Sequence, residues 1–266
     1  MTPSRLAAAA ALVLLVSTGC AVGQRTSAPT DLPGPSPWTP GSRVAAGEGS
    51  PEEAYVAALA RAGEPERMRR GLALTAEGSD AHAYLVHQAA VAQAWVDEGD
   101  PVPNADVNDT VDGYELCPAG EPGAEPPCVS YSDLTVEDGL VTGLLVDGRD
   151  PGPSLVVADG EDDESEGVRA DLVSAYQSVV DKTLVVTVEF SAKERVSLDL
   201  LQASYAKRGG RERRTQSAAG RLELDAGATT HAAFFFPAAV PGGTLRVNGC
   251  LEECSALVEI ALPVER

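Results

Sequence analysis

The sequence lacks the residue patterns from which many enzymes build an active site. It has no G-x-S-x-G, Walker A, G-x-G-x-x-G or H-E-x-x-H motif. Histidine is scarce, and His82 and His87 lie about 140° apart around a helix, so they cannot chelate one metal together. Catalysis needs a nucleophile or a tuned acid and base held close together. The sequence therefore assigns no catalytic residue, no metal site and no cofactor.

Positive charge is also scarce, because 20 Lys and Arg residues face 40 Asp and Glu residues, which gives a formal net charge of −20. A chain this acidic repels polyanions over most of its surface. The composition therefore predicts no nucleic-acid binding.

Long hydrophobic runs are missing except for Leu6 to Val16, which follows Arg5 and ends before Ser17-Thr18-Gly19-Cys20. Eleven apolar residues are too few to cross a bilayer, whose hydrocarbon core needs roughly 20 helical residues. A charged start, a short apolar core and small residues at the end are typical of a secretory signal. Residues 1–19 are therefore predicted to be a cleaved export signal.

The small residues before Cys20 resemble the bacterial lipobox, with Ser17 where a large aliphatic residue is more usual. The resemblance covers about twenty residues. It implies cleavage before Cys20, a thioether-linked diacylglycerol on its sulfur and often a third acyl chain, such as palmitate, on the new amino group. It also implies that the protein contacts the membrane through this lipid, on the outer face of the cell membrane.

The remaining four cysteines form two local pairs, Cys117 with Cys128 and Cys250 with Cys254. Such pairs are expected to become disulfides in an oxidising compartment. Closing loops of about 12 and 5 residues is worth on the order of 2–3 kcal/mol each. The alternative, a zinc site, is disfavoured because no C-x2-C spacing is present.

Periodicity predicts two folded regions after a Pro-, Gly- and Ser-rich tether over 20–49. Helices are expected over 51–62, 65–75 and 80–97, followed by strands over 114–117, 128–134, 140–146 and 155–158. Helices followed by a meander predict an α+β domain over 50–158. This order is similar to the nuclear transport factor 2-like fold, a cone-like curved antiparallel sheet around three helices.

The acidic run 159–166 is predicted to be an extended linker, because its like charges repel one another. After it, strand signals recur about every ten residues, which predicts an all-β immunoglobulin-like sandwich over 167–266. The residues 222–227 and 232–237 look like the strand-loop-strand of uncharacterised sandwich domains in Gram-positive lipoproteins.

One candidate pocket lies on the third predicted helix, where His87 is expected beside Tyr84 and Trp95. Cone-like domains of the nuclear transport factor 2-like kind include isomerases and dehydratases that use Asp and His in such a cavity. The alternative is that His87 is an ordinary surface or core residue of the helix. A calcium loop over 106–112 is disfavoured because Val111 stands where Gly is required and Cys117 where the bidentate Glu should be.

A second candidate site is a basic cluster around Gly209-Gly210, formed by Lys207, Arg208, Arg211, Arg213 and Arg214. These long side chains are expected to keep a hairpin tip soluble. They are also a candidate contact for envelope proteins or an anionic wall polymer. The sequence favours a lipid-anchored protein with a binding or scaffolding role in the cell envelope, with an enzyme or small apolar-ligand carrier as the alternative.

Overall fold

The computed structural model describes residues 49–118 and 128–265. The predicted signal, Cys20 and nearly all of the predicted tether lie outside the described residues. Within the described part of the chain, no helix is long and apolar enough to cross a membrane. The chain combines a few helices with mostly antiparallel sheets, which agrees with an α+β class.

The three predicted helices are present, and capping side chains mark the starts of the first and the third; the first helix ends at Leu59, three residues before its expected end. Helix α1 (Pro51–Leu59) begins after Ser50, whose Oγ accepts a hydrogen bond from the Glu53 N–H at 3.2 Å. Helix α2 (Pro65–Arg70) continues as the 3-10 helix η1 (Gly71–Leu74). Helix α3 (Asp80–Glu98) is capped by Ser79 and ends at Gly99, whose φ of 97° is the left-handed conformation that glycine adopts most readily.

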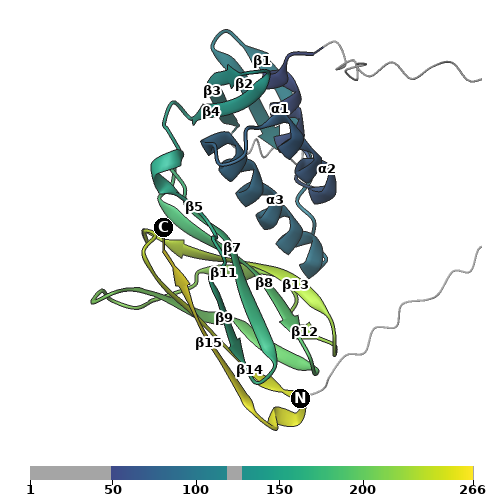
Figure 1. Cartoon of the computed structure of the whole chain (residues 1–266), viewed down its shortest axis with the longest axis vertical. Coiled ribbons are helices and arrows are strands. Elements are labelled where there is room, and N and C mark those ends of the chain that lie inside the picture. Colours follow the sequence, from purple (N-terminus) through teal and green to yellow (C-terminus); the bar gives the residue numbers. More distant parts are fainter. Residues whose placement is uncertain (1–48, 119–127, 266) are drawn as a thin grey trace, which may run out of the picture. The chain divides into compact units, whose positions relative to one another are not determined.

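Four strands pair in sequential, antiparallel order beside the helices, as Figure 1 shows: β1 (Ala105–Thr110), β2 (Gly113–Pro118), β3 (Val129–Glu137) and β4 (Leu140–Val146). Their buried side chains form one core with Tyr55, Tyr84 and Leu85 of the helices. Strand β1 was not predicted from the sequence, because this edge strand is exposed along nearly all of its length and has no apolar alternation.

The rest of the chain forms two larger sheets. The six-stranded sheet has the order β11-β13-β8-β7-β5, with β6 also on β7, and the five-stranded sheet has the order β10-β9-β14-β15, with β12 also on β9. The strands are β5 (Leu155–Val157), β6 (Asp162–Ser165), β7 (Val168–Gln177), β8 (Thr183–Ala192), β9 (Val196–Lys207), β10 (Arg213–Arg214), β11 (Ser217–Ala219), β12 (Glu223–Leu224), β13 (Thr229–Pro237), β14 (Gly243–Leu251) and β15 (Leu257–Val264). Short 3-10 turns, η2 (Gly152–Ser154) and η3 (Glu252–Cys254), precede β5 and follow β14.

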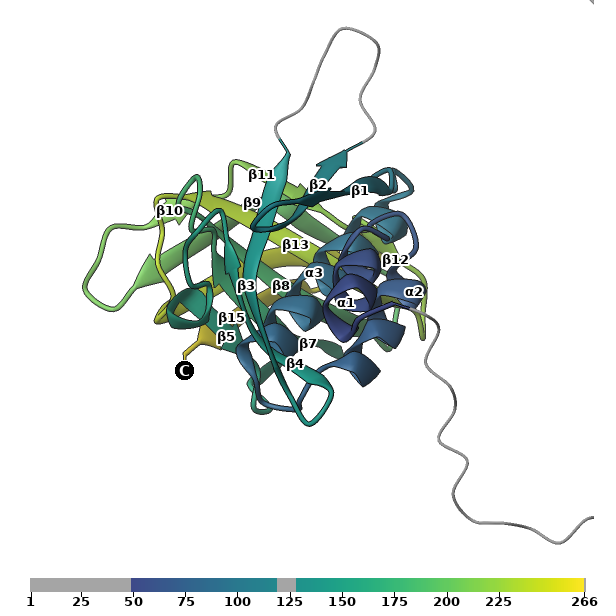
Figure 2. The ribbon, with the colours of Figure 1, turned by 90° about the horizontal axis from the view of Figure 1, so that it is seen from above.

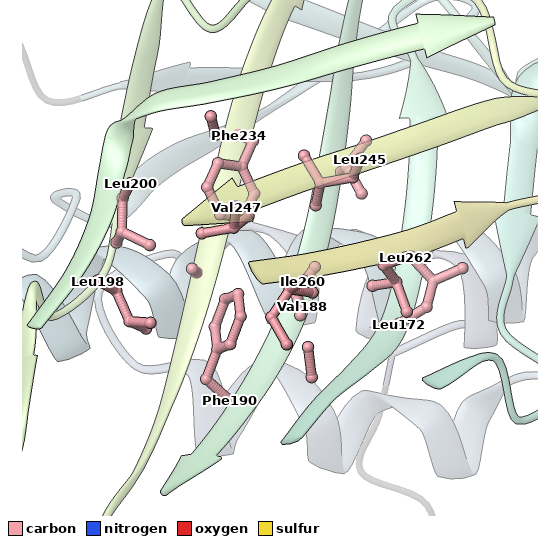
Figure 3. Packing of buried hydrophobic residues seen from close by; sticks show 14 of the residues in the cluster. Leu172, Val188, Phe190, Leu198, Leu200, Phe234, Leu245, Val247, Ile260 and Leu262 are labelled. Atoms are coloured by element: carbon pink, nitrogen blue, oxygen red, sulfur yellow. The ribbon is translucent and has the colours of Figure 1, made fainter. Parts of the chain in front are cut away.

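These two sheets share one hydrophobic core (Figure 3). In β8, Val188 and Phe190 alternate with more polar neighbours and meet Phe234 of β13. From the other sheet, Leu245 and Ile260 complete the layer. Burying such a side chain contributes about 1.5–3 kcal/mol.

Both predicted disulfides are present. Cys117 at the end of β2 is bonded to Cys128 just before β3, and Cys250 of β14 is bonded to Cys254 of η3. The prediction that these four cysteines form two local pairs is therefore confirmed.

The acidic run differs from the expected extended linker. Residues Asp162–Ser165 form β6, which pairs with β7 in antiparallel register. Arg169 of β7 forms ion pairs with Asp162 and Asp171, and Lys193, which follows β8, pairs with Glu164, so these cations offset the repulsion. Residues 46–266 accordingly form one compact unit.

The side chains of β6 also reach the edge of the five-stranded sheet. The Asp163 carboxylate accepts the Ala261 N–H at 2.7 Å, and the Ser165 hydroxyl accepts the Glu259 N–H at 3.1 Å. Both donors belong to β15, the edge strand of that sheet. The acidic run therefore joins the two sheets.

We expect Asp163→Ala to lower the free energy of unfolding by about 1 kcal/mol, because one hydrogen bond between the sheets is lost. Urea denaturation followed by circular dichroism measures this change. Glu194→Ala, at an exposed carboxylate between β8 and β9, serves as the control and should stay within about 0.5 kcal/mol of the parent. Equal stability of both variants would contradict the role given to Asp163.

Candidate functional site

His87 is buried between α3 and the six-stranded sheet. It is 2% exposed, its Nδ1 lies 2.9 Å from the Ser174 Oγ, and its ring packs edge-on against Tyr176. The Ser174 Oγ in turn lies 2.7 Å from the Thr187 Oγ1, so the polar groups satisfy one another. Burial lowers the pKa of His87 to about 3, which keeps the imidazole neutral. This geometry attaches α3 to β7 and β8.

The other two candidate pocket residues lie in different surroundings along α3. Tyr84 is 3% exposed, its hydroxyl lies 3.3 Å from the Tyr131 hydroxyl, and its ring meets Tyr176 edge-on. Trp95 packs against Phe235 of β13 at a ring-centroid distance of 6.2 Å. Tyr176 thus contacts Tyr84 and His87, whereas Trp95 belongs to a separate apolar cluster with Ala219 and Ala233.

A polar cluster at the end of α3 was missed by the sequence analysis. The Asp97 carboxylate accepts the His231 backbone N–H at 2.6 Å and lies 3.5 Å from Nδ1 of the same residue. On the other side of the ring, Nε2 lies 3.3 Å from the Glu189 carboxylate. Arg221 Nε also donates to the Asp97 carbonyl at 3.1 Å, which satisfies one acceptor at the helix end.

This cluster clamps α3 onto β13 and β8. Because the two imidazole nitrogens point in opposite directions, Asp97 and Glu189 cannot share one metal ion with His231. No sequence signal could have found the cluster, since Asp97 and His231 are separated by 134 positions.

One group of potential metal ligands occurs in the described part of the chain. Glu115, Cys117 and Cys128 offer ligand atoms within 4.8 Å of one another. The two sulfurs are bonded to each other, however, and only thiolates bind metals strongly. A single carboxylate then remains. The residues Asp106, Asn108 and Asp109 lie on β1.

The basic cluster forms a hairpin, as predicted. Strand β9 leads into β10 through a turn in which the Gly210 N–H donates to the Lys207 carbonyl at 2.7 Å and Gly209 has a φ of 71°. Figure 2 shows this loop, next to the label β10, projecting from the sheet. We call it the basic hairpin, and its cationic side chains are all exposed: Lys207, Arg208, Arg211, Arg213 and Arg214.

The cations of the basic hairpin have no acidic partner. Among the residues that the structure describes, no carboxylate lies within 4.0 Å of any of the five. Arg213 donates instead to the Pro237 carbonyl, and Arg214 to the Gln202 side chain, each at 3.1 Å. By contrast, Arg169 and Arg195 each pair with two or more carboxylates. The basic hairpin is thus an unneutralised positive patch on an acidic chain.

The same segment contains Ser204-Tyr205-Ala206-Lys207, which matches the S-x-x-K pattern of some acyl-transfer enzymes. Residues three apart share a face on a helix, but on a strand they point to opposite sides. Ser204 and Lys207 both lie on β9, and the Ser204 hydroxyl donates to Glu212 at 2.6 Å. The pattern therefore does not assemble a nucleophile and its base here.

No protein-family model matches this chain, and a search of curated proteins finds no match.

We expect acid to destabilise the protein through His87. The pKa of His87 is about 3 in the folded state and near 6.5 in an unfolded chain, so the unfolded state binds one more proton between these values. Stability is therefore complete above about pH 6.5 and falls as the pH drops toward 3. Between pH 7 and pH 5 this loss amounts to about 2 kcal/mol.

The measurement compares urea denaturation of the parent and of His87→Gln at pH 7 and pH 5. All other titrating groups are common to both proteins, so His87→Gln should lose about 2 kcal/mol less than the parent on acidification. His82→Gln, on the same helix, is the matched control for substitution of a histidine by an amide. If the free energies of unfolding of the parent and of His87→Gln differ by the same amount at pH 7 and at pH 5, the low pKa given to His87 is wrong.

Proposed function

We propose that this chain is a lipoprotein held on the outer face of the cell membrane by the lipid on Cys20, with a binding or scaffolding role in the cell envelope. The observation that carries the binding role is the basic hairpin, whose five exposed cations have no ion-pair partner within residues 49–118 and 128–265, on a chain of net charge −20. The signal at residues 1–19 and the small residues before Cys20 support the anchoring.

The clustering is informative because five like charges close together repel one another unless an anionic partner offsets the repulsion. Complementary charges at the rim of an interface chiefly raise the association rate and the specificity. Exposed arginines are also enriched where proteins bind other molecules. The expected partners are therefore acidic, namely an anionic wall polymer or an acidic face of an envelope protein.

The packing around α3 supports recognition over turnover. Tyr84 and His87 are buried by the surrounding protein, and the imidazole of His87 is held neutral by its low pKa. A catalytic acid or base needs contact with substrate and a pKa near the working pH. We therefore assign no catalytic residue and no cofactor.

The alternative function, a small apolar-ligand carrier or enzyme, is favoured by one observation. A mainly apolar hollow of about 430 Å³ lies at the start of α1, with Pro51, Ala54, Ala57 and Leu74 among its lining residues. Apolar hollows of this size are typical of small-molecule sites. It lies on a different helix from the candidate pocket residues.

The finer fold resemblances belong to the same proposal. Helices followed by the antiparallel sheet β1–β4 support a nuclear transport factor 2-like, cone-like unit. Two antiparallel sheets that share a core support an immunoglobulin-like sandwich. Neither fold by itself specifies an activity.

Cys20→Ala tests the anchoring. Without the thiol that accepts the lipid, the protein should be released or left unprocessed, because two or three acyl chains provide the membrane affinity. Cell fractionation and intact-protein mass measure both outcomes. Ser17→Leu, which places an aliphatic residue at the usual lipobox position, is the control and should remain membrane-held. A Cys20→Ala protein that is still membrane-held and correctly cleaved would overturn the anchoring.

Charge reversal in the basic hairpin tests the binding role. Lys207→Glu with Arg211→Glu should leave the far-ultraviolet circular dichroism unchanged, because both side chains are exposed, and should reduce retention on isolated envelope at least tenfold. Arg61→Glu with Arg70→Glu makes the same charge change at exposed sites near α1 and α2 and should retain the parent's binding. Equal retention of all three proteins would argue against the basic hairpin as a contact.

A further inference from the structure

We propose that one face of the basic hairpin, carrying Lys207, Arg211 and Arg213, binds the phosphate groups of a linear polyanion. This inference rests on the binding role given above to the basic hairpin and is independent of the lipid on Cys20. It adds the chemical class of the ligand and the side chains that contact it.

Strand geometry sorts the side chains of the basic hairpin onto two faces. Tyr205 pairs directly with Arg213, so their side chains lie on the same face, and Lys207 joins them because it is two residues along β9. Ser204 pairs with Arg214 on the opposite face. Alternation therefore separates the cations into two sets.

The only carboxylate within the basic hairpin lies with the opposite set. Glu212 accepts a hydrogen bond from the Ser204 hydroxyl at 2.6 Å, on the face that carries Arg214. The face with Lys207, Arg211 and Arg213 is left with positive charge alone. An anion approaching this face meets no repelling carboxylate from the basic hairpin itself.

This cationic face borders a hollow of about 180 Å³. Its walls are Lys207, Gly210, Arg211 and Arg213 on the side of the basic hairpin and residues 238–240, which follow β13, on the other. Tyr205 also lines it, and its hydroxyl donates to the Val240 carbonyl at 3.0 Å, which ties the basic hairpin to the far wall. The hollow has room for a group of phosphate size.

Arg213 is held in position for such a group. One of its guanidinium nitrogens donates to the Pro237 carbonyl at 3.1 Å, which fixes the side chain while other N–H groups remain. The planar guanidinium fork matches a phosphate with two parallel hydrogen bonds. A phosphate also presents more acceptor oxygens than a carboxylate, so three convergent cations favour phosphate.

A thread-like polyanion suits this site better than a flat anionic membrane. A bilayer meets a whole face of the protein, and a chain with 40 acidic residues against 20 basic ones is on balance repelled by an anionic surface. A linear chain can contact the basic hairpin alone.

The test titrates the purified full-length chain with fluorescein-labelled linear polyphosphate and measures fluorescence anisotropy. The parent should bind at low salt, and Lys207→Glu with Arg211→Glu should bind at least tenfold more weakly. Arg61→Glu with Arg70→Glu, which has the same net charge, should stay within twofold of the parent. In Lys207→Gln with Arg211→Gln, the slope of log affinity against log salt should become shallower by about 1.4, for two lost phosphate contacts.

Polyglutamate of equal charge should bind at least tenfold more weakly than polyphosphate. Equal binding of both polymers would overturn the phosphate assignment. If Arg61→Glu with Arg70→Glu weakens polyphosphate binding as much as Lys207→Glu with Arg211→Glu does, net charge explains the effect and the basic hairpin is not the site. Tighter binding to vesicles containing anionic phospholipid would favour a membrane surface and overturn the polymer. If the protein does not bind polyphosphate but is retained on isolated envelope, the phosphate assignment is wrong and the proposed function stands.

Discussion

The structure depends on the packing of α3 against the outer face of the six-stranded sheet. Strand β13 carries Phe234 toward the core shared by the two sheets and Phe235 toward Trp95 of the helix. Its run of apolar residues is therefore buried on both sides, as in a central strand covered by helices. Without α3, the outer face would expose apolar and unsatisfied polar groups, so the helices and the sheets stabilise each other.

Two polar clusters define where α3 lies along this sheet. His87 meets Ser174 near the middle of the helix, and Asp97 meets His231 at its end. Apolar contacts alone tolerate sliding, whereas a buried hydrogen bond is costly to leave unmade. The clusters therefore specify the position of α3, while the apolar contacts supply most of its stability.

Local signals predicted the parts of the fold that depend on neighbouring residues. Ser79 and Gly99 mark the two ends of α3, and the spacing of the cysteines predicted both disulfides. Strands β1 and β6 were missed because they have few apolar residues, and their pairing is decided by β2 and β7. Pairing between distant segments leaves little trace in the local sequence.

In the candidate sites, too, local sequence predicted some features and contacts between distant segments decided the others. The clustering of cations predicted the basic hairpin, but only the register of β9 with β10 separates Glu212 from Arg213 onto different faces. Helical spacing placed His87 beside Tyr84, but it could not reveal that a sheet formed by residues about ninety positions later covers the imidazole. Sequence predicted which residues are unusual, and tertiary structure determined what each one contacts.

The edge of the five-stranded sheet at β15 has a consequence for self-association. An open strand edge is a template on which a second chain can add its own strand. Along β15, the N–H groups of Glu259 and Ala261 are taken by side chains of β6, and the next alternate position, Pro263, has no N–H. The acidic strand therefore protects this edge from edge-to-edge aggregation, and its negative charge repels the matching strand of another copy.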